Sequence, residues 1–175
     1  MSLAESGSLG LAGPRERLSG LARAVLAQYA ALHSPDTLEI VLVSTDRHQP
    51  LAERVARWGW LGWLPHVRPT RGQECRALLA YDNEQAAARF AEVRGRTPGQ
   101  YEGLRTLVVL DGDPGTPALR EAAAWCASAE GRAAGCTSCA SRRRRRPLRP
   151  RRSPRPSRRR ARRSPRSATA GPWRS

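Results

Sequence analysis

The sequence predicts an α/β fold in which helices alternate with the strands of a parallel sheet. Two segments are typical of strands, residues 38–45 (LEIVLVST) and 104–110 (LRTLVVL). The first contains a near-continuous apolar run, as expected of a strand that is covered on both faces. Segments with helical periodicity precede, separate and follow these two strands, which gives the order α-β-α-α-β-α. Such alternation is typical of domains in which helices pack against a parallel sheet.

The first helix is predicted from its start signal and its apolar spacing. Residues 1–13 consist mostly of small residues without an apolar period, and we expect them to be flexible. Pro14 suits the first position of a helix because its backbone is already fixed near the helical φ. The helix ends before Pro35, which disfavours helical geometry in the preceding residue. Apolar residues recur along it at spacings of three and four, at Leu18, Leu21, Val25, Tyr29 and Leu32.

The later helices are predicted in the same way. A second helix should run from Pro50 to about Trp58, whereas residues 58–65 (WGWLGWLP) contain too much glycine for a firm helix assignment. Residues 73–93 have a helical pattern with a break near 81–83, and a last helix should cover about 117–129. Trp58, Trp60 and Trp63 fit a cluster that closes a small core better than an exposed binding surface.

Charge divides the chain into two parts. Residues 1–135 carry 15 arginines and 15 acidic residues, whereas residues 136–175 carry 16 arginines and no acid, which accounts for the net charge of +16. An arginine-, proline- and serine-rich segment has almost nothing apolar to bury, so we expect disorder there. The predicted organisation is therefore a flexible N-terminus (1–13), one folded domain (14–130) and a disordered C-terminal tail (131–175).

Cellular targeting is predicted mainly from what the sequence lacks. It has no run of about 18 apolar residues, so we expect no membrane-spanning helix and no membrane partner. Its start lacks the basic residue and apolar run of a secretory signal. We therefore expect a cytoplasmic or nuclear protein.

Five segments follow one another in a characteristic order: LARAVLAQYAALHS, LEIVLVSTDRH, WLGWLP, AAARFAEVRG and GLRTLVVLDGD. This order resembles the thioredoxin fold, and within it the nucleoredoxin and tryparedoxin branch, over about residues 15–130. The resemblance implies a central first strand with a Cys-x-x-Cys before Arg15 and a cis-proline at Arg105. Neither is present, so we expect an incomplete, three-layer thioredoxin-like domain that is redox-inactive and serves at most as a binding module. The alternative is a fragment of a longer thiol–disulfide oxidoreductase whose active site lies upstream.

Other motifs give weaker signals. Cys136 and Cys139 form a literal Cys-x-x-Cys, but they lie outside the predicted domain, which favours flexible thiols over a catalytic dithiol or a zinc site. The segment starting at Asp111 (DGDPGT) predicts a tight turn at a strand end, since Thr116 stands one position too late for the phosphatase motif of the haloacid dehalogenase type. No glycines are spaced as GxxxxGKS/T, and we expect neither a cofactor nor a metal.

The arginine-rich tail gives a second alternative function, non-specific binding of nucleic acid or of an acidic partner, with a possible role in nuclear localisation. A tail translated from GC-rich DNA without selection would have the same composition. The candidate nucleic-acid-binding residues are Arg142, Arg143, Arg144, Arg145, Arg146, Arg149, Arg151, Arg152, Arg158, Arg159, Arg160, Arg162 and Arg163.

Overall fold

The structure, a computed structural model, describes residues 7–96 and 103–143. In chain order the elements are β1 (Ser8–Gly13), α2 (Arg15–Leu32), β2 (Leu38–Val43), α3 (Leu51–Trp58), the 3-10 helices η1 (Gly59–Trp63) and η2 (Pro65–Val67), β3 (Leu79–Ala80), α4 (Asn83–Arg94), β4 (Arg105–Asp111), α5 (Pro117–Cys126), α6 (Ala129–Ala133) and β5 (Cys136–Arg143).

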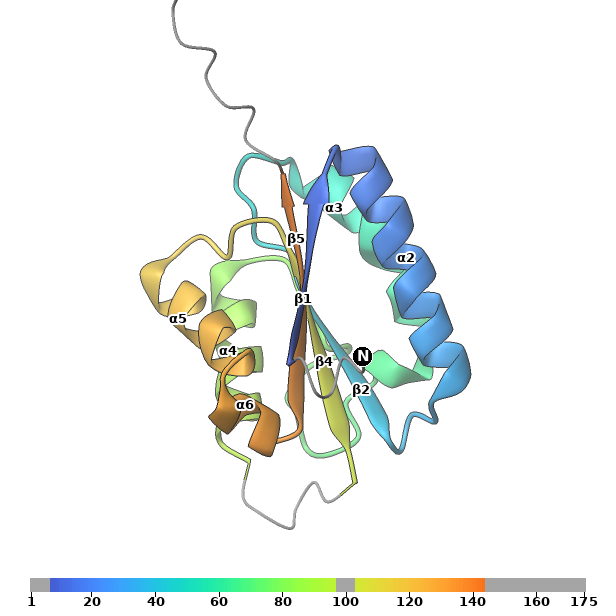
Figure 1. Ribbon diagram of the computed structural model, residues 1–175, viewed down its shortest axis with the longest axis vertical. Coiled ribbons are helices and arrows are strands. Elements are labelled where there is room, and N and C mark those ends of the chain that lie inside the picture. Colours follow the sequence, from blue (N-terminus) through green and yellow to red (C-terminus); the bar gives the residue numbers. More distant parts are fainter. Residues whose placement is uncertain (1–6, 97–102, 144–175) are drawn as a thin grey trace, which may run out of the picture. The chain divides into compact units, whose positions relative to one another are not determined.

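The five strands form one parallel sheet in the order β1-β5-β4-β2-β3. Helices α2 and α3 cover one face of this sheet, and α4, α5 and α6 cover the other (Figure 1). The two strands predicted from apolar runs are direct neighbours, with Leu38 opposite Arg105. Every residue of β2 is buried, as expected for a strand covered on both faces. The prediction of an α/β fold with a parallel sheet is therefore confirmed.

The thioredoxin-like version of this fold required a missing central strand between the two predicted strands. The structure has no place for one, because β2 and β4 pair with each other along their whole length. The position on the other side of β4 is taken by β5, and β1 pairs in turn with β5. Both β1 and β5 lie outside residues 14–130, the range in which we expected the folded domain.

Two helices differ from their predicted form. In α2 the core side chains are Leu18, Ala22 and Leu26, whereas Leu21 is 50% exposed and Leu32 is 80% exposed. The apolar stripe predicted for this helix therefore mixes two faces. Within the segment 73–93, only α4 is α-helical, because residues 79–80 form β3 and pair with β2.

The tryptophan-rich segment forms the end of α3 and the whole of η1. Trp58, the last residue of α3, is fully buried, and Trp60 packs against the core. Trp63, by contrast, is 86% exposed. The predicted aromatic core cluster therefore contains Trp58 and Trp60 but not Trp63.

Candidate functional site

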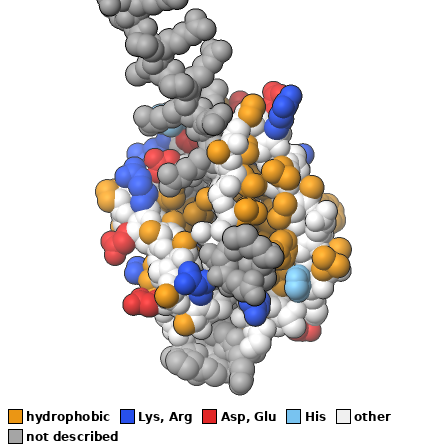
Figure 2. Space-filling view, viewed as in Figure 1, with side chains coloured by type: hydrophobic (Ala, Val, Ile, Leu, Met, Phe, Trp, Pro, Cys, Tyr) orange, Lys and Arg blue, Asp and Glu red, His pale blue; other side chains and the backbone are white. Residues whose placement is uncertain are grey.

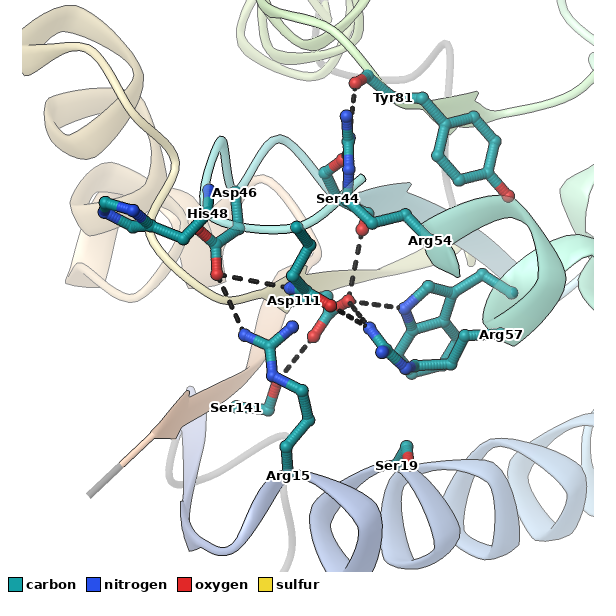
Figure 3. Close-up of polar contacts among 12 residues, drawn as sticks. Arg15, Ser19, Ser44, Asp46, His48, Arg54, Arg57, Tyr81, Asp111 and Ser141 are labelled. Carbon is teal, nitrogen blue, oxygen red and sulfur yellow. Dashed lines mark hydrogen bonds and ion pairs between the residues drawn. The ribbon is translucent and has the colours of Figure 1, made fainter. Parts of the chain in front are cut away.

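Polar side chains gather where the parallel strands end, at the carboxyl end of the sheet. Ser44 and Asp46 follow β2, Asp111 ends β4, and Ser141 lies near the end of β5 (Figure 3). Helices α2 and α3 add arginines to this group. In open α/β sheets ligands usually bind at this end, so the cluster is the natural candidate site.

Asp111 lies at the centre of the cluster. Its Oδ2 accepts hydrogen bonds from the Trp58 indole N–H at 2.7 Å and from the Ser44 hydroxyl at 3.1 Å. The same oxygen pairs with the Arg57 guanidinium at 3.2 Å, while Oδ1 accepts from the Ser141 hydroxyl at 3.3 Å. Asp111 is only 7% exposed. A carboxylate with four donors around it is neutralised and oriented within the fold.

Asp46 is held in the same way by its neighbours. It pairs with Arg15 at 2.9 Å, and it also accepts hydrogen bonds from the backbone N–H of His48 at 3.0 Å and the side-chain amide of Gln49 at 3.2 Å. Gly112 packs against it with a φ of +90°, and a Cβ at this glycine would lie 2.8 Å from the Asp46 Oδ2. The turn after β4 therefore needs glycine both for its backbone conformation and for the space that Asp46 occupies.

Two arginines of α3 connect this helix to the strand ends. Arg54 is buried and donates to the backbone carbonyls of Ser44 and Tyr81, which follow β2 and β3. Arg57 donates to Gln49 in addition to Asp111. Figure 3 shows that these side chains point inward to the strand ends. Their positions are consistent with a role in holding α3 against the sheet.

The remaining space at this site is small. A depression lined by Arg15, Leu18, Ser19, Asp111 and Ser141 has room for about one water molecule. In the described part of the chain, no three His, Cys, Asp or Glu side chains group together in a way that could hold a metal ion. The arrangement therefore stabilises the strand ends, and this depression between described residues is too small to hold a substrate.

The junction between β1 and α2 lies at the position where many α/β proteins bind phosphate groups on a helix N-terminus. Pro14 alone separates the strand from the helix, and the sequence contains no lysine that could reach a phosphate. Arg15, the first residue of α2, is instead paired with Asp46. The geometry does not build a phosphate-binding loop at this junction.

The structure corrects the prediction made for the Cys-x-x-Cys pair. Cys136 and Cys139 were expected to be flexible thiols, but both are buried in β5. Their side chains point to opposite faces of the sheet, since residues three apart on a strand do. The neighbouring Cys126 thiol of α5, together with burial, raises the pKa of Cys136. Burial also raises the pKa of Cys139. The Cys-x-x-Cys spacing therefore brings no dithiol together.

The thirteen candidate nucleic-acid-binding arginines stay a prediction, because the structure describes only the backbones of two of them. The backbones of Arg142 and Arg143 belong to β5. The other eleven, Arg144, Arg145, Arg146, Arg149, Arg151, Arg152, Arg158, Arg159, Arg160, Arg162 and Arg163, lie outside the described residues.

Sequence reasoning assigned Asp111 to a turn and did not bring it together with Ser44, Asp46 or Arg57. One signal was available, because polar residues directly follow both predicted strands. Parallel strands place their carboxyl ends at the same end of the sheet. The arginines gave no such signal, since nothing in their spacing distinguishes them from other charged residues on a helix surface.

Comparison with known proteins points to secretion systems. The chain is 35% identical over 86 residues to the ESX-5 secretion system protein EccC5 of Mycobacterium tuberculosis, a match that covers 47% of this chain and 6% of the relative. It is 40% identical over 60 residues to the ESX-4 protein EccC4 of the same organism, covering 34% of this chain and 4% of the relative. An EccC protein of Thermomonospora curvata is 37% identical over 59 residues, with shares of 33% and 4%. No family model matches the chain.

These relatives correct the interpretation of the sequence. The expected membership of the thioredoxin fold, with its nucleoredoxin-like and redox character, is wrong, because the matches are to EccC proteins. The chain spans about one twentieth of the length of these relatives. The nucleic-acid partner expected for the tail gains no support from them. In the part of the chain that the structure describes, no helix is long and apolar enough to cross a membrane.

Proposed function

We propose that this chain is a protein-binding domain of an ESX-type secretion system, related to one segment of an EccC protein. The similarity to EccC5 carries the proposal, since 86 aligned residues at 35% identity take in nearly half of the chain. Because the relatives are named as components of a secretion machinery, partners of this domain would be other proteins of that machinery.

The geometry of the carboxyl end supports a binding role over a catalytic one. The two buried acidic side chains there are neutralised within the fold, Asp46 by Arg15 and Asp111 by Arg57. A general base needs a carboxylate that can reach a substrate, and Asp111 is instead surrounded by donors from Trp58, Ser44 and Ser141. Function should therefore depend on the surface of the domain.

The test is affinity purification of the tagged full-length chain from the organism that encodes it. A matched control bait is the segment 136–175 alone, because its arginines attract acidic proteins without specificity. We expect other ESX components to be enriched with the full chain and not with the control, and deletion of the gene to reduce export of ESX-dependent proteins. Equal recovery with both baits together with unchanged export would refute the proposal.

A further inference from the structure

Strand β1 lies at a lateral edge of the sheet and pairs with β5 on one side only. Within residues 7–96 and 103–143, no strand pairs with its outer side. The Gly7 carbonyl accepts a hydrogen bond from the Ser138 N–H and so points inward, toward β5. Because backbone groups alternate along a strand, the N–H and C=O groups of Ser8, Gly10 and Ala12 point outward. These three residues present the hydrogen-bonding pattern that a further strand would need.

Apolar side chains accompany this open edge. Leu9, which is 36% exposed, and the half-buried Leu11 lie on the face of β1 that α2 covers, since Gly13 on the same face packs against Leu18 of that helix. The outer flank of α2 continues the apolar surface with Leu21, Val25 and Leu32, at spacings of four and seven. Viewed from the side of β1, Figure 2 shows hydrophobic side chains gathered beside this strand and over α2.

The edge also lacks the features that normally prevent strand addition. Ser8–Gly13 contains no charged residue and no proline, and its length is typical of a strand that can pair. On the face opposite α2, a Cβ at Gly10 would meet no atom of the described residues within 4 Å, so this position of β1 is open. A free edge with exposed apolar neighbours and none of these protections is typical of a pairing surface.

Charge identifies the kind of strand that fits. Arg17 lies on the exposed flank of α2 near Leu21, and the Arg132 side chain reaches the start of β1, where a Cβ at Gly7 would lie 2.6 Å from its Cδ. A second copy of this chain would bring the same two arginines to this edge, and these like charges would repel each other. An acidic strand would be attracted.

We propose that the outer edge of β1 binds an extended segment of a different protein, in which apolar residues alternate with polar ones and acidic residues flank them. The segment adds a sixth strand to the sheet through Ser8, Gly10 and Ala12, and its apolar side chains cover Leu9 and the outer flank of α2. This mode of recognition takes affinity from backbone hydrogen bonds and specificity from alternate side chains. The inference stands on the geometry of β1 and does not require the secretion role.

The experiment compares two variants of the full chain at one position. Gly10→Pro removes an outward N–H without removing a hydrogen bond to β5, and Gly10→Ala keeps that N–H and places its Cβ in open space. The probe is a fluorescent peptide, Asp-Glu-Val-Thr-Val-Thr-Val-Glu, and its control has glycine in place of each valine. Measurements are made at about 0.3 M salt, which screens attraction to the arginine-rich tail.

We expect the valine peptide to bind more tightly than the glycine peptide and to slow hydrogen exchange at the Gly10 and Ala12 amides. Gly10→Pro should lower its affinity about tenfold, whereas Gly10→Ala should leave it unchanged. Leu21→Glu keeps β1 intact and should also weaken binding by repelling the acidic peptide. Equal binding of the two peptides, equal affinity of the two Gly10 variants, or a dimer in sedimentation that Gly10→Pro dissociates would overturn the proposal.

Discussion

Replacing Asp111 by asparagine removes the negative charge at the centre of the carboxyl-end cluster and nearly preserves the shape of the side chain. Arg57 then loses its ion pair with this residue. When the amide oxygen takes the place of Oδ2, it still accepts the Ser44 hydroxyl hydrogen, but the amide nitrogen in the place of Oδ1 cannot accept from Ser141. Breaking a buried ion pair by removing one partner costs about 3–5 kcal/mol. Asparagine can still accept the Trp58 N–H, so we expect a loss of about 3 kcal/mol.

Asp113→Asn is the matched control, because Asp113 lies in the same turn and its ion pair with Arg120 is exposed. Exposed pairs contribute about 0–1 kcal/mol. Urea unfolding followed by tryptophan fluorescence should lower the midpoint by about 1.5 M for Asp111→Asn and hardly at all for Asp113→Asn. A midpoint for Asp111→Asn within experimental error of the unchanged protein would refute the reasoning, and so would equal losses for the two variants.

Three further predictions concern a turn glycine, a core leucine and a buried cysteine. Gly112→Ala should destabilise the fold by about 1–3 kcal/mol, because the φ of Gly112 is +90° and the new Cβ would press on Asp46. The control, Gly20→Ala on the exposed side of α2, should stabilise the fold by up to about 1 kcal/mol. Thermal unfolding of both variants measures the two effects. Leu26→Ala should cost about 2–5 kcal/mol and the exposed Leu32→Ala less than about 0.5 kcal/mol, and equal losses in urea unfolding would contradict the assignment of the core face of α2. Burial raises the pKa of the Cys139 thiol, so iodoacetamide at neutral pH should label the less buried Cys75 before Cys139. Above about pH 8.5 the thiol loses its proton more readily in the unfolded chain, so the free energy of unfolding should fall as pH rises. A Cys139→Ala variant should show a smaller fall over the same pH range.

The central part of the fold could be predicted because its strands carry a strong signal. Strands β2 and β4 are covered by helices on both faces, and each contains four consecutive apolar residues, 40–43 and 107–110. Strand β1 lies at an open edge, and Leu9 and Leu11 are its only large apolar residues, too few to give a strand signal. Strand β5 is central yet polar, with Thr137 and Ser138 buried between its neighbours. Its burial is decided by tertiary pairing, which local sequence does not encode.

The thioredoxin resemblance failed for a related physical reason. Order and spacing of helices and strands are shared by many α/β folds, and they do not determine which strands pair. The Cys-x-x-Cys at Cys136 was equally uninformative, because its meaning depends on whether the segment is a helix start or a strand. At a helix start the two thiols approach each other, whereas on β5 they point to opposite faces.

The fold satisfies its polar groups at one end of the sheet and leaves backbone groups open at one edge. At the carboxyl end, Asp46 and Asp111 find partners within the domain, so the place where α/β proteins usually bind ligands is filled by internal ion pairs. At the lateral edge, the outward backbone groups of β1 and the flank of α2 have no such cover among the described elements. Exposed backbone pairing groups beside apolar surface favour association with another chain. The binding surface that we propose therefore lies at the edge of the sheet and not at the carboxyl ends of its strands.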